Sequence, residues 1–183
     1  PILPDTPPTL TIEQSAALER ITALRQKGFA AILLDGVTGS GKTEIYLQAA
    51  AETIHHKQSV LVLVPEIALI SQTERRFRAR FGERVAVLHS GLTAGERLDQ
   101  WLRIRSRAAP IVIGARSAIF APFEEIGLIV VDEEHDGAYK QETGLRYSAR
   151  DLATVRARMN DCPVILGSAT PSLESLFNVE QQR

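Results

Sequence analysis

Residues Ala30 to Thr43 read AAILLDGVTGSGKT, and this stretch decides the fold. It joins a short apolar run to a loop that matches the phosphate-binding pattern G-x-x-x-x-G-K-[ST]. Glycines let the backbone curl until consecutive N–H groups face one anion. A helical pattern over residues 45–54 follows, and the positive end of such a helix points at the same place. The order of strand, loop and helix therefore predicts a nucleotide-binding phosphate loop.

The chemistry of this loop follows from its residue types. Lys42 is placed to reach the β- and γ-phosphates of a nucleotide, and Thr43 is placed to give its hydroxyl to Mg²⁺. The predicted nucleotide-binding residues of the loop and the helix start are Gly36, Val37, Thr38, Gly39, Ser40, Gly41, Lys42, Thr43 and Glu44.

Further apolar runs cover residues 60–64, 85–88, 111–113, 128–131 and 164–166. They are nearly continuous in Val, Ile, Leu and Ala, which is typical of parallel strands buried on both faces. Helical spacing precedes the first strand, from Thr11 to a stop at Gly28, and separates the later ones. Trp101 shares this spacing with Leu98 and Leu102, which predicts a place in the core. The alternation predicts an α/β fold with a mostly parallel sheet and helices on both faces.

An acidic cluster follows the run that ends at Val131. Parallel sheets bind ligands at the carboxyl ends of their strands, so Asp132 is expected to help hold Mg²⁺. Glu133 is expected to orient and deprotonate the attacking water. We expect Lys42, Asp132 and Glu133 to be the catalytic residues. The alternative for the cluster is a solvated turn.

The composition is that of one domain of 183 residues, with 21 basic and 22 acidic side chains and a formal net charge of −1. Such a balance gives no global signal for nucleic acid. Cys162 is the single cysteine, which excludes an intrachain disulfide, and its apolar surroundings predict a core position. No apolar run reaches the ~18 residues of a membrane span. We expect a reducing, cytoplasmic setting.

The N-terminal residues 1–9 are rich in proline and predict a linker, so the domain is expected to cover residues 10–183. The chain begins with Pro1 instead of Met, which predicts that it is part of a longer protein.

Two motifs narrow the class of protein. Asp132-Glu133-Glu134-His135 resembles the Asp-Glu-x-His motif of superfamily 2 helicases, and Ser168-Ala169-Thr170 resembles their Ser-Ala-Thr motif. From about Leu10 onward the chain is similar to the primosomal helicases of replication restart. The segments that carry this similarity are 36–44 GVTGSGKTE, 63–67 LVPEI, 89–92 HSGL, 114–118 GARSA, 131–136 VDEEHD, 139–141 YKQ and 146–151 RYSARD.

The resemblance implies the first RecA-like lobe of an ATP-dependent 3′-to-5′ DNA helicase, which acts at stalled forks in replication restart and primosome assembly. It implies ATP and Mg²⁺ as cofactors, with zinc held elsewhere in the longer protein. The implied partners are forked or single-stranded DNA, other primosome proteins and single-stranded-DNA-binding protein, near the bacterial nucleoid and away from membranes. A second lobe supplies an arginine finger worth about 10³–10⁵ in rate in other nucleotide hydrolases. We therefore expect this lobe alone to hydrolyse ATP poorly.

The resemblance also implies that His135, Ser168 and Thr170 couple hydrolysis to DNA binding, and that Gln14 contacts the adenine base. Gln14 has a local alternative. With Thr11 it forms a capping box pattern, in which the Gln14 side chain bonds back to the Thr11 backbone N–H.

The loops after the strands are expected to contact DNA. The implied contacts are Pro65, Glu66, His89, Arg116, Ser117, Tyr139, Lys140 and Tyr147. Arg116 can hold a phosphate with two hydrogen bonds, or it can form a structural salt bridge. Tyr139 and Tyr147 can stack on bases or pack against the sheet. Both lie in the polar segment 136–151, which predicts a mobile loop and has Leu145 where the family pattern has tryptophan.

The sequence leaves three alternative functions open. They are another superfamily 2 translocase, a phosphate-loop kinase or transport ATPase without a DNA role, and a nucleotide-binding module without catalysis. The carboxylate of Glu133 argues against the last of these.

Overall fold

The computed structural model describes residues 5–37, 39–144, 146–173 and 175. Its centre is a six-stranded sheet in the order β1-β8-β5-β2-β4-β3, in which every neighbouring pair is parallel. The strands are β1 (Ala30–Asp35), β2 (Ser59–Leu63), β3 (Val85–Leu88), β4 (Ile111–Gly114), β5 (Ile126–Val131) and β8 (Pro163–Ser168). The helices are α1 (Ile12–Arg25), α2 (Lys42–His55), α3 (Ile67–Phe81), α4 (Ala94–Arg105) and α5 (Ala149–Met159). The predicted α/β fold is confirmed.

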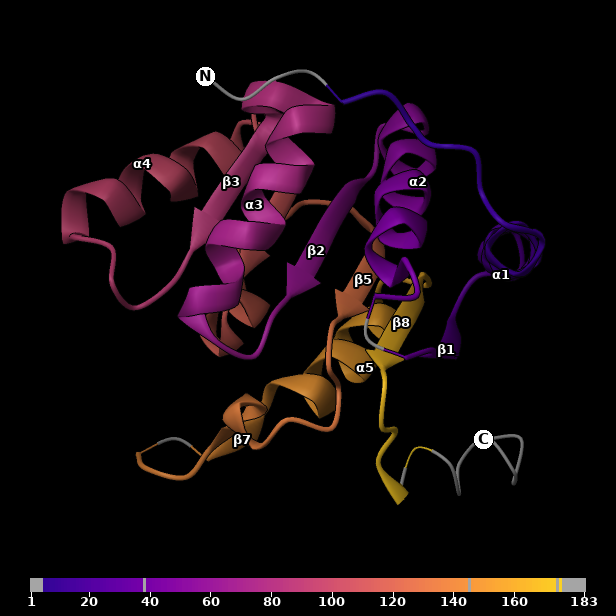
Figure 1. Cartoon of the computed structure of the whole chain (residues 1–183). Helices are drawn as coiled ribbons and strands as arrows, with labels where there is room; N and C mark the ends of the chain where they lie inside the picture. The colour runs from indigo at the N-terminus through magenta and orange to yellow at the C-terminus, as the bar shows by residue number, and fades with distance from the viewer. Residues whose placement is uncertain (1–4, 38, 145, 174, 176–183) are drawn as a thin grey trace.

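Successive residues of the central strand β2 point to opposite faces of the sheet. Val62 packs in a core cluster with Ile21 of α1 and Phe77 of α3. Its neighbour Leu61 packs in a second cluster with Ala153 of α5. The sheet is thus covered on both faces, with α2 and α3 on the side nearer the viewer and α5 behind it (Figure 1). A strand covered in this way needs apolar residues at every position, which explains the continuous apolar run.

Two helices begin at capping boxes. At α1 the Thr11 side chain accepts from the Gln14 backbone and the Gln14 side chain accepts from the Thr11 backbone, and Thr93 and Glu96 do the same at α4. Each box satisfies two backbone donors that the helix leaves open. After α1 the chain turns at Gly28, whose φ of +95° favours glycine. No helix within the described ranges is both long and apolar enough to cross a membrane.

Burial departs from the sequence pattern at one strand and on one helix. β1 lies at the edge of the sheet, so Ala31 is exposed even though it belongs to an apolar run. The prediction that Trp101 lies in the core is wrong. It is half-buried, and its neighbours Leu98 and Leu102 are 57% and 51% exposed. The helix turns a different face to the sheet, because Ile104 is its buried residue.

Segment 136–151 contains structure that the sequence did not predict. A 3₁₀ turn, η3 (Gly137–Tyr139), leads into an antiparallel pair of short strands, β6 (Lys140–Gln141) and β7 (Tyr147–Ser148). Leu145 lies outside the described residues. Figure 1 shows this hairpin beyond the ends of the strands, on the side to which their arrows point. It therefore lies at the same edge of the sheet as the phosphate loop.

Candidate nucleotide-binding site

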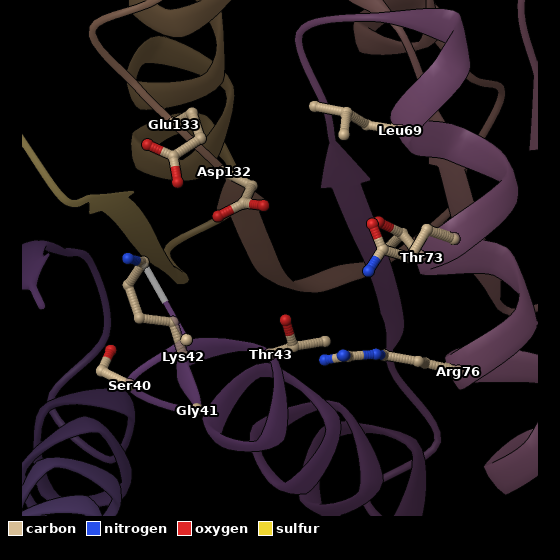
Figure 2. Close-up of a pocket in the computed structure, with 11 residues that line it drawn as sticks. Ser40, Gly41, Lys42, Thr43, Leu69, Thr73, Arg76, Asp132 and Glu133 are labelled. Atoms are coloured by element: carbon tan, nitrogen blue, oxygen red, sulfur yellow. The ribbon is translucent and has the colours of Figure 1, made fainter. Parts of the chain in front are cut away.

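A cavity of about 360 Å³ lies between the phosphate loop, α3 and the end of β5 (Figure 2). Its lining combines loop residues with two acidic residues and one side of α3. The lining residues are Gly39, Ser40, Gly41, Lys42, Thr43, Leu69, Gln72, Thr73, Arg76, Asp132 and Glu133. The side chains assigned from sequence to phosphate, Mg²⁺ and water activation therefore surround one space.

Backbone conformation shapes the phosphate loop. Gly39 and Gly41 have φ values of +84° and +86°, which glycine adopts without strain. Gly41 is the N-cap residue of α2, and no side chain caps this helix, so its first-turn N–H groups can bind an anion. Lys42 is buried, and its ammonium donates to the Gly36 carbonyl oxygen at 2.5 Å. The loop thus offers backbone donors and a held cation. Thr38 lies outside the described residues.

Hydrogen bonds to its backbone N–H and to its carboxylate hold Asp132 at the end of β5. Its backbone N–H donates to the Leu63 carbonyl oxygen at 2.9 Å, and its Oδ1 accepts from the Tyr46 hydroxyl at 3.0 Å. Burial raises the pKa of Asp132, while the Tyr46 hydrogen bond and the charge of Lys42 act in the opposite direction. Burial also raises the pKa of Tyr46, so its hydroxyl stays a donor. Tyr46 was not predicted as a site residue from the sequence, because a tyrosine one turn into a helix is an ordinary core residue.

Glu133 has a left-handed backbone, with a φ of +47°. A non-glycine residue in this region is uncommon, and it persists where the surroundings fix it, as at functional sites. Its Oε2 lies 3.8 Å from Nδ1 of His135. The same ring lies 2.7 Å from the Ser168 hydroxyl through Nδ1 and 3.3 Å from the Thr170 hydroxyl through Nε2. The structure therefore brings the expected coupling residues together beside Glu133.

Gln14 forms the capping box that was one of its two expected roles, and the adenine contact stays a prediction. Its Oε1 accepts from the Thr11 backbone N–H at 3.0 Å, which completes the capping box. Its Nε2 donates to the carbonyl oxygen of Ser40 in the phosphate loop at 2.9 Å. A Cβ at Gly41 would lie 2.3 Å from this Nε2. The two ends of one amide therefore cap α1 and join α1 to the phosphate loop.

The assignment of Glu44 to the nucleotide needs correction. Its carboxylate accepts from Arg80 of α3 at 3.0 and 3.1 Å and from the amide of Gln48 at 2.9 Å. The Arg80 side chain is 7% exposed and also bonds Asp5. Glu44 does not line the cavity, because this buried arginine occupies its carboxylate. The Glu44 side chain joins α2 to α3.

The role of Glu134 was also not predicted from the sequence. Its side chain is fully buried, and it accepts from the Ser172 backbone N–H at 2.8 Å and from the Ser175 hydroxyl at 2.9 Å. Arg150 of α5 supplies an ion pair at 3.3 Å, which offsets the cost of burying the charge. Glu134 thus joins the end of β5 to α5 and to the segment after β8. In the sequence it is one more acidic residue beside the Asp-Glu pair.

Helix α3 forms one side of the cavity, which was also not foreseen. Leu69, Gln72, Thr73 and Arg76 line it, and their spacing places them on one face of the helix. Figure 2 shows Arg76 extending toward Thr43. The spacing was a usable signal, but it identifies a cavity wall only when the position of α3 relative to α2 is known.

The residues expected to contact DNA after β2, β3 and β4 lie at the same edge of the sheet. Glu66 and Ser117 are exposed, and His89 is half-buried with its Nδ1 accepting from the Gly91 N–H at 3.1 Å. The expectation for Pro65 needs correction, because its side chain is buried. The chain there leads from the buried strand β2 into α3.

Arg116 begins a 3₁₀ turn, η2 (Arg116–Phe120), and it turns toward the hairpin. Its Nη1 donates to the carbonyl oxygens of Ala138 at 3.2 Å and Lys140 at 2.6 Å. The expected structural alternative was a salt bridge, but the acceptors in the described part of the chain are backbone carbonyls. Arg116 therefore joins the end of β4 to the hairpin that follows η3.

The expectation that Tyr139 stacks on a base is wrong. Its side chain is 1% exposed, and its hydroxyl donates to the carbonyl oxygens of Leu63 at 3.1 Å and Asp132 at 2.5 Å. Two carbonyl groups at the ends of β2 and β5 thus gain a buried donor, and the ring fills the core cluster under α5. Tyr139 is a packing residue.

Tyr147 and Lys140 remain accessible on the hairpin. Lys140 is exposed, and the half-buried ring of Tyr147 packs edge-on against Phe120 with centroids 5.3 Å apart. A groove of about 580 Å³ runs along this hairpin. Its lining residues are Lys140, Gln141, Glu142, Arg146, Tyr147 and Ser148. Basic groups beside an aromatic ring suit a nucleic-acid strand.

The phosphate loop, the acidic pair at the end of β5 and the parallel sheet together define a RecA-like phosphate-loop domain. The model of the DEAD/DEAH box helicase family matches residues 11–179. The chain therefore belongs to the DEAD/DEAH box helicase family.

The chain is similar to curated proteins named replication restart protein PriA. It is 53% identical to the protein of Bacillus subtilis (strain 168) over 176 residues, which cover 96% of this chain and 22% of that protein. It is 52% identical to the protein of Synechocystis sp. over 177 residues, which cover 96% of this chain and 21% of that protein. The chain thus spans about a fifth of the length of these relatives.

Solved structures share the fold. The structure of RecG bound to a three-way DNA junction has a TM-score of 0.71 at 25% identity, over 94% of this chain and 22% of that chain. The UvsW helicase from Bacteriophage T4 has a TM-score of 0.65 at 18% identity, over 98% of this chain and 60% of that chain. The RecA-like fold that the sequence resemblance implied is confirmed.

Proposed function

We propose that this chain is the first, nucleotide-binding lobe of an ATP-dependent 3′-to-5′ DNA helicase that acts at stalled forks in replication restart. The supporting observation is that one cavity is lined by Lys42 and Thr43 of the phosphate loop together with Asp132 and Glu133 of the Asp-Glu-x-His motif. The high identity to PriA proteins favours the restart branch over other superfamily 2 translocases. The direction of movement and the fork as substrate are proposed from that similarity.

The oxygen donors of the cavity fit Mg²⁺, which prefers carboxylates, hydroxyls and phosphate oxygens. Asp132 and Thr43 would hold the ion, and Lys42 with the first-turn N–H groups of α2 would hold the phosphates. Bound there, Mg²⁺ would neutralise charge that develops on the transferred phosphoryl group. The described residues contain no group of three or more His, Cys, Asp or Glu that could hold a metal alone.

Glu133 performs the proton transfer in this proposal. Its carboxylate accepts a proton from the attacking water as the water oxygen bonds to the γ-phosphorus. The bond from that phosphorus to the bridging oxygen breaks, and ADP and phosphate leave. The left-handed backbone of Glu133 limits where its carboxylate can lie. Gln14, which contacts the phosphate loop, would contact the adenine base.

The proposed DNA surface lies at the same edge of the sheet. Strand-end residues would contact the phosphate backbone, and Tyr147 with Lys140 would contact a single strand along the hairpin groove. The strand-end residues are Glu66, His89, Arg116 and Ser117. His135, Ser168 and Thr170 would couple DNA contact to hydrolysis, since they join the ends of β5 and β8 beside Glu133.

The wider assignments extend to the longer protein. We propose that it works with other primosome proteins and single-stranded-DNA-binding protein on forked DNA, in the bacterial cytoplasm near the nucleoid. Its zinc would be held by residues outside this chain. A second lobe would supply the arginine finger, so this lobe alone would hydrolyse ATP slowly.

A binding experiment tests the nucleotide site. Affinity for a fluorescent ADP analogue with Mg²⁺ is measured for the full-length protein, for Lys42→Ala and for the control Lys27→Ala, whose side chain is exposed after α1. Because a charge-assisted hydrogen bond contributes about 1.5–3 kcal/mol, Lys42→Ala should weaken binding roughly 10- to 100-fold. The control should bind like the wild type. Equal binding by all three proteins would refute the assignment of Lys42 to the phosphates.

A further inference from the structure

Tyr46 links the helix of the phosphate loop to the acidic pair. It lies one turn into α2, after Lys42 and Thr43, and it is 1% exposed. Its hydroxyl donates to Oδ1 of Asp132 at 3.0 Å. A buried tyrosine hydroxyl needs a partner, but this partner is one of the side chains that the proposed function assigns to Mg²⁺.

Gly167 of β8 provides a second, independent observation. A Cβ at this position would lie 1.7 Å from the Tyr46 hydroxyl oxygen. Its φ is not among the positive values found in this chain, so backbone conformation does not require glycine here. Glycine weakens the interior of a strand and often marks a close approach. The position is therefore kept free of a side chain at the point where the hydroxyl reaches Asp132.

A second buried tyrosine, Tyr139, lies in the same part of the molecule but makes a different kind of hydrogen bond. Tyr139 is equally buried, yet its hydroxyl donates to the backbone carbonyl oxygens of Leu63 and Asp132. Tyr46 donates instead to a carboxylate oxygen. A carboxylate oxygen moves with the side chain that carries it, whereas the position of a backbone carbonyl oxygen is set by the strand. The Tyr46 contact can therefore fix the rotation of the Asp132 carboxylate, whereas the Tyr139 contacts fix only backbone.

We propose that Tyr46 is a positioning residue, which holds Oδ1 of Asp132 so that the carboxylate is oriented in advance for Mg²⁺ bound with the nucleotide phosphates. The inference rests on the proposed function. Mg²⁺ demands near-ideal octahedral geometry and tolerates misplaced ligands poorly. Hydrogen-bond partners of metal ligands typically contribute about 10–100-fold to metal affinity. Gly167 has a part in this arrangement, because it leaves the space that the hydroxyl needs.

The test uses the full-length protein and the variants Tyr46→Phe and Tyr139→Phe. Affinity for a fluorescent ADP analogue is measured in EDTA and then across a Mg²⁺ titration, with melting temperature as a separate readout. In Tyr46→Phe the Mg²⁺ concentration at the midpoint should rise roughly 10-fold or more, while affinity in EDTA stays at the wild-type value. Tyr139→Phe should lower the melting temperature and leave the Mg²⁺ midpoint unchanged.

Two outcomes overturn the inference in different ways. A wild-type Mg²⁺ midpoint in Tyr46→Phe would refute the positioning role and leave the nucleotide site intact. Nucleotide binding by the wild type that does not depend on Mg²⁺ would refute the assigned metal ligands, and the positioning role with them.

A double-mutant cycle with Gly167→Ala guards against a general structural effect. The added Cβ should raise the Mg²⁺ midpoint in the wild-type background, because it displaces the hydroxyl. It should raise the midpoint much less when Tyr46 is already Phe, because the hydroxyl that the Cβ meets is absent. Equal effects of Gly167→Ala in both backgrounds would contradict the proposal, since independent sites add.

Discussion

The imidazole of His135 joins the ends of two neighbouring strands, because its Nδ1 lies 2.7 Å from the hydroxyl oxygen of Ser168. Its other nitrogen lies 3.3 Å from the hydroxyl of Thr170. The same ring is a near neighbour of Glu133, at 3.8 Å. A displacement of the segment after β8 would therefore move the His135 side chain, which lies beside the proposed general base Glu133.

Ser168→Ala should separate nucleotide binding from DNA response. The serine hydroxyl lies outside the cavity lining, so ADP affinity should not change. Stimulation of hydrolysis by DNA should fall roughly tenfold, within the range of coupling energies between sites. ATP turnover by the full-length protein with and without forked DNA measures the effect. Ser106→Ala, at the far end of α4, is the control, and undiminished stimulation in Ser168→Ala would contradict the coupling role.

Glu134→Ala should lower stability strongly. The change removes the buried one of the two carboxylates that pair with Arg150, the other being Asp151, and it removes the acceptor of the Ser172 N–H. Breaking a buried pair by removing one partner costs about 3–5 kcal/mol, which corresponds to roughly 10 °C in melting temperature for a domain of this size. Differential scanning calorimetry measures it. The control is Glu142→Ala, which changes an exposed carboxylate on the hairpin and should have the melting temperature of the wild type. A wild-type melting temperature in Glu134→Ala would contradict the prediction.

Tyr139 of η3 and Tyr147 of the hairpin should behave differently toward DNA. Tyr147→Ala should weaken binding of single-stranded DNA about tenfold, since stacking contributes about 1–3 kcal/mol per base. Tyr147→Phe keeps the ring and should bind normally. Tyr139→Phe should leave DNA affinity unchanged, because this residue is buried. Fluorescence anisotropy with a labelled oligonucleotide measures all three, and equal loss in Tyr139→Phe and Tyr147→Ala would contradict the assignment.

Cys162 should make stability depend on alkaline pH. Burial raises the pKa of its thiol to about 12, whereas a free thiol has a pKa of about 8.5. Between these two pKa values the folded state keeps the thiol proton that the unfolded state releases. The contribution of the buried thiol to the free energy of unfolding is therefore complete below about pH 8.5 and is lost as the pH rises toward 12. The free energy of unfolding of the wild type, relative to Cys162→Ala, should therefore fall between pH 8 and pH 10. A constant difference across this range would contradict the shift.

The fold and the centre of the site could be predicted because their signals are local. The apolar run at residues 30–34, the loop pattern over residues 36–43 and the helical pattern over residues 45–54 follow one another directly, so strand, loop and helix are predicted without reference to the rest of the chain. Asp132 and Glu133 could be added because parallel strands end at one edge of a sheet, wherever in the sheet β5 lies. Both arguments need only secondary structure and strand direction.

The remaining features depend on which side chains meet across the fold. Tyr139 and Tyr147 occupy similar positions in a polar segment, yet one fills the core and the other lies on the surface. Trp101 has the helical spacing of a core residue, but α4 packs through Ile104 instead. Glu44 follows the phosphate loop directly, but its carboxylate accepts a hydrogen bond from Arg80 of α3. These choices are made by tertiary packing, which a single sequence does not display.

ATP hydrolysis by the full-length protein, with and without forked DNA, tests the central claim most directly. The proposal predicts strong stimulation by DNA in the wild type and in the control Glu19→Gln, which changes an exposed residue of α1. Glu133→Gln should abolish the stimulated rate while ADP still binds, because the proton acceptor is lost and the phosphate contacts remain. Equal hydrolysis with and without DNA would contradict the helicase assignment and favour a phosphate-loop kinase or transport ATPase.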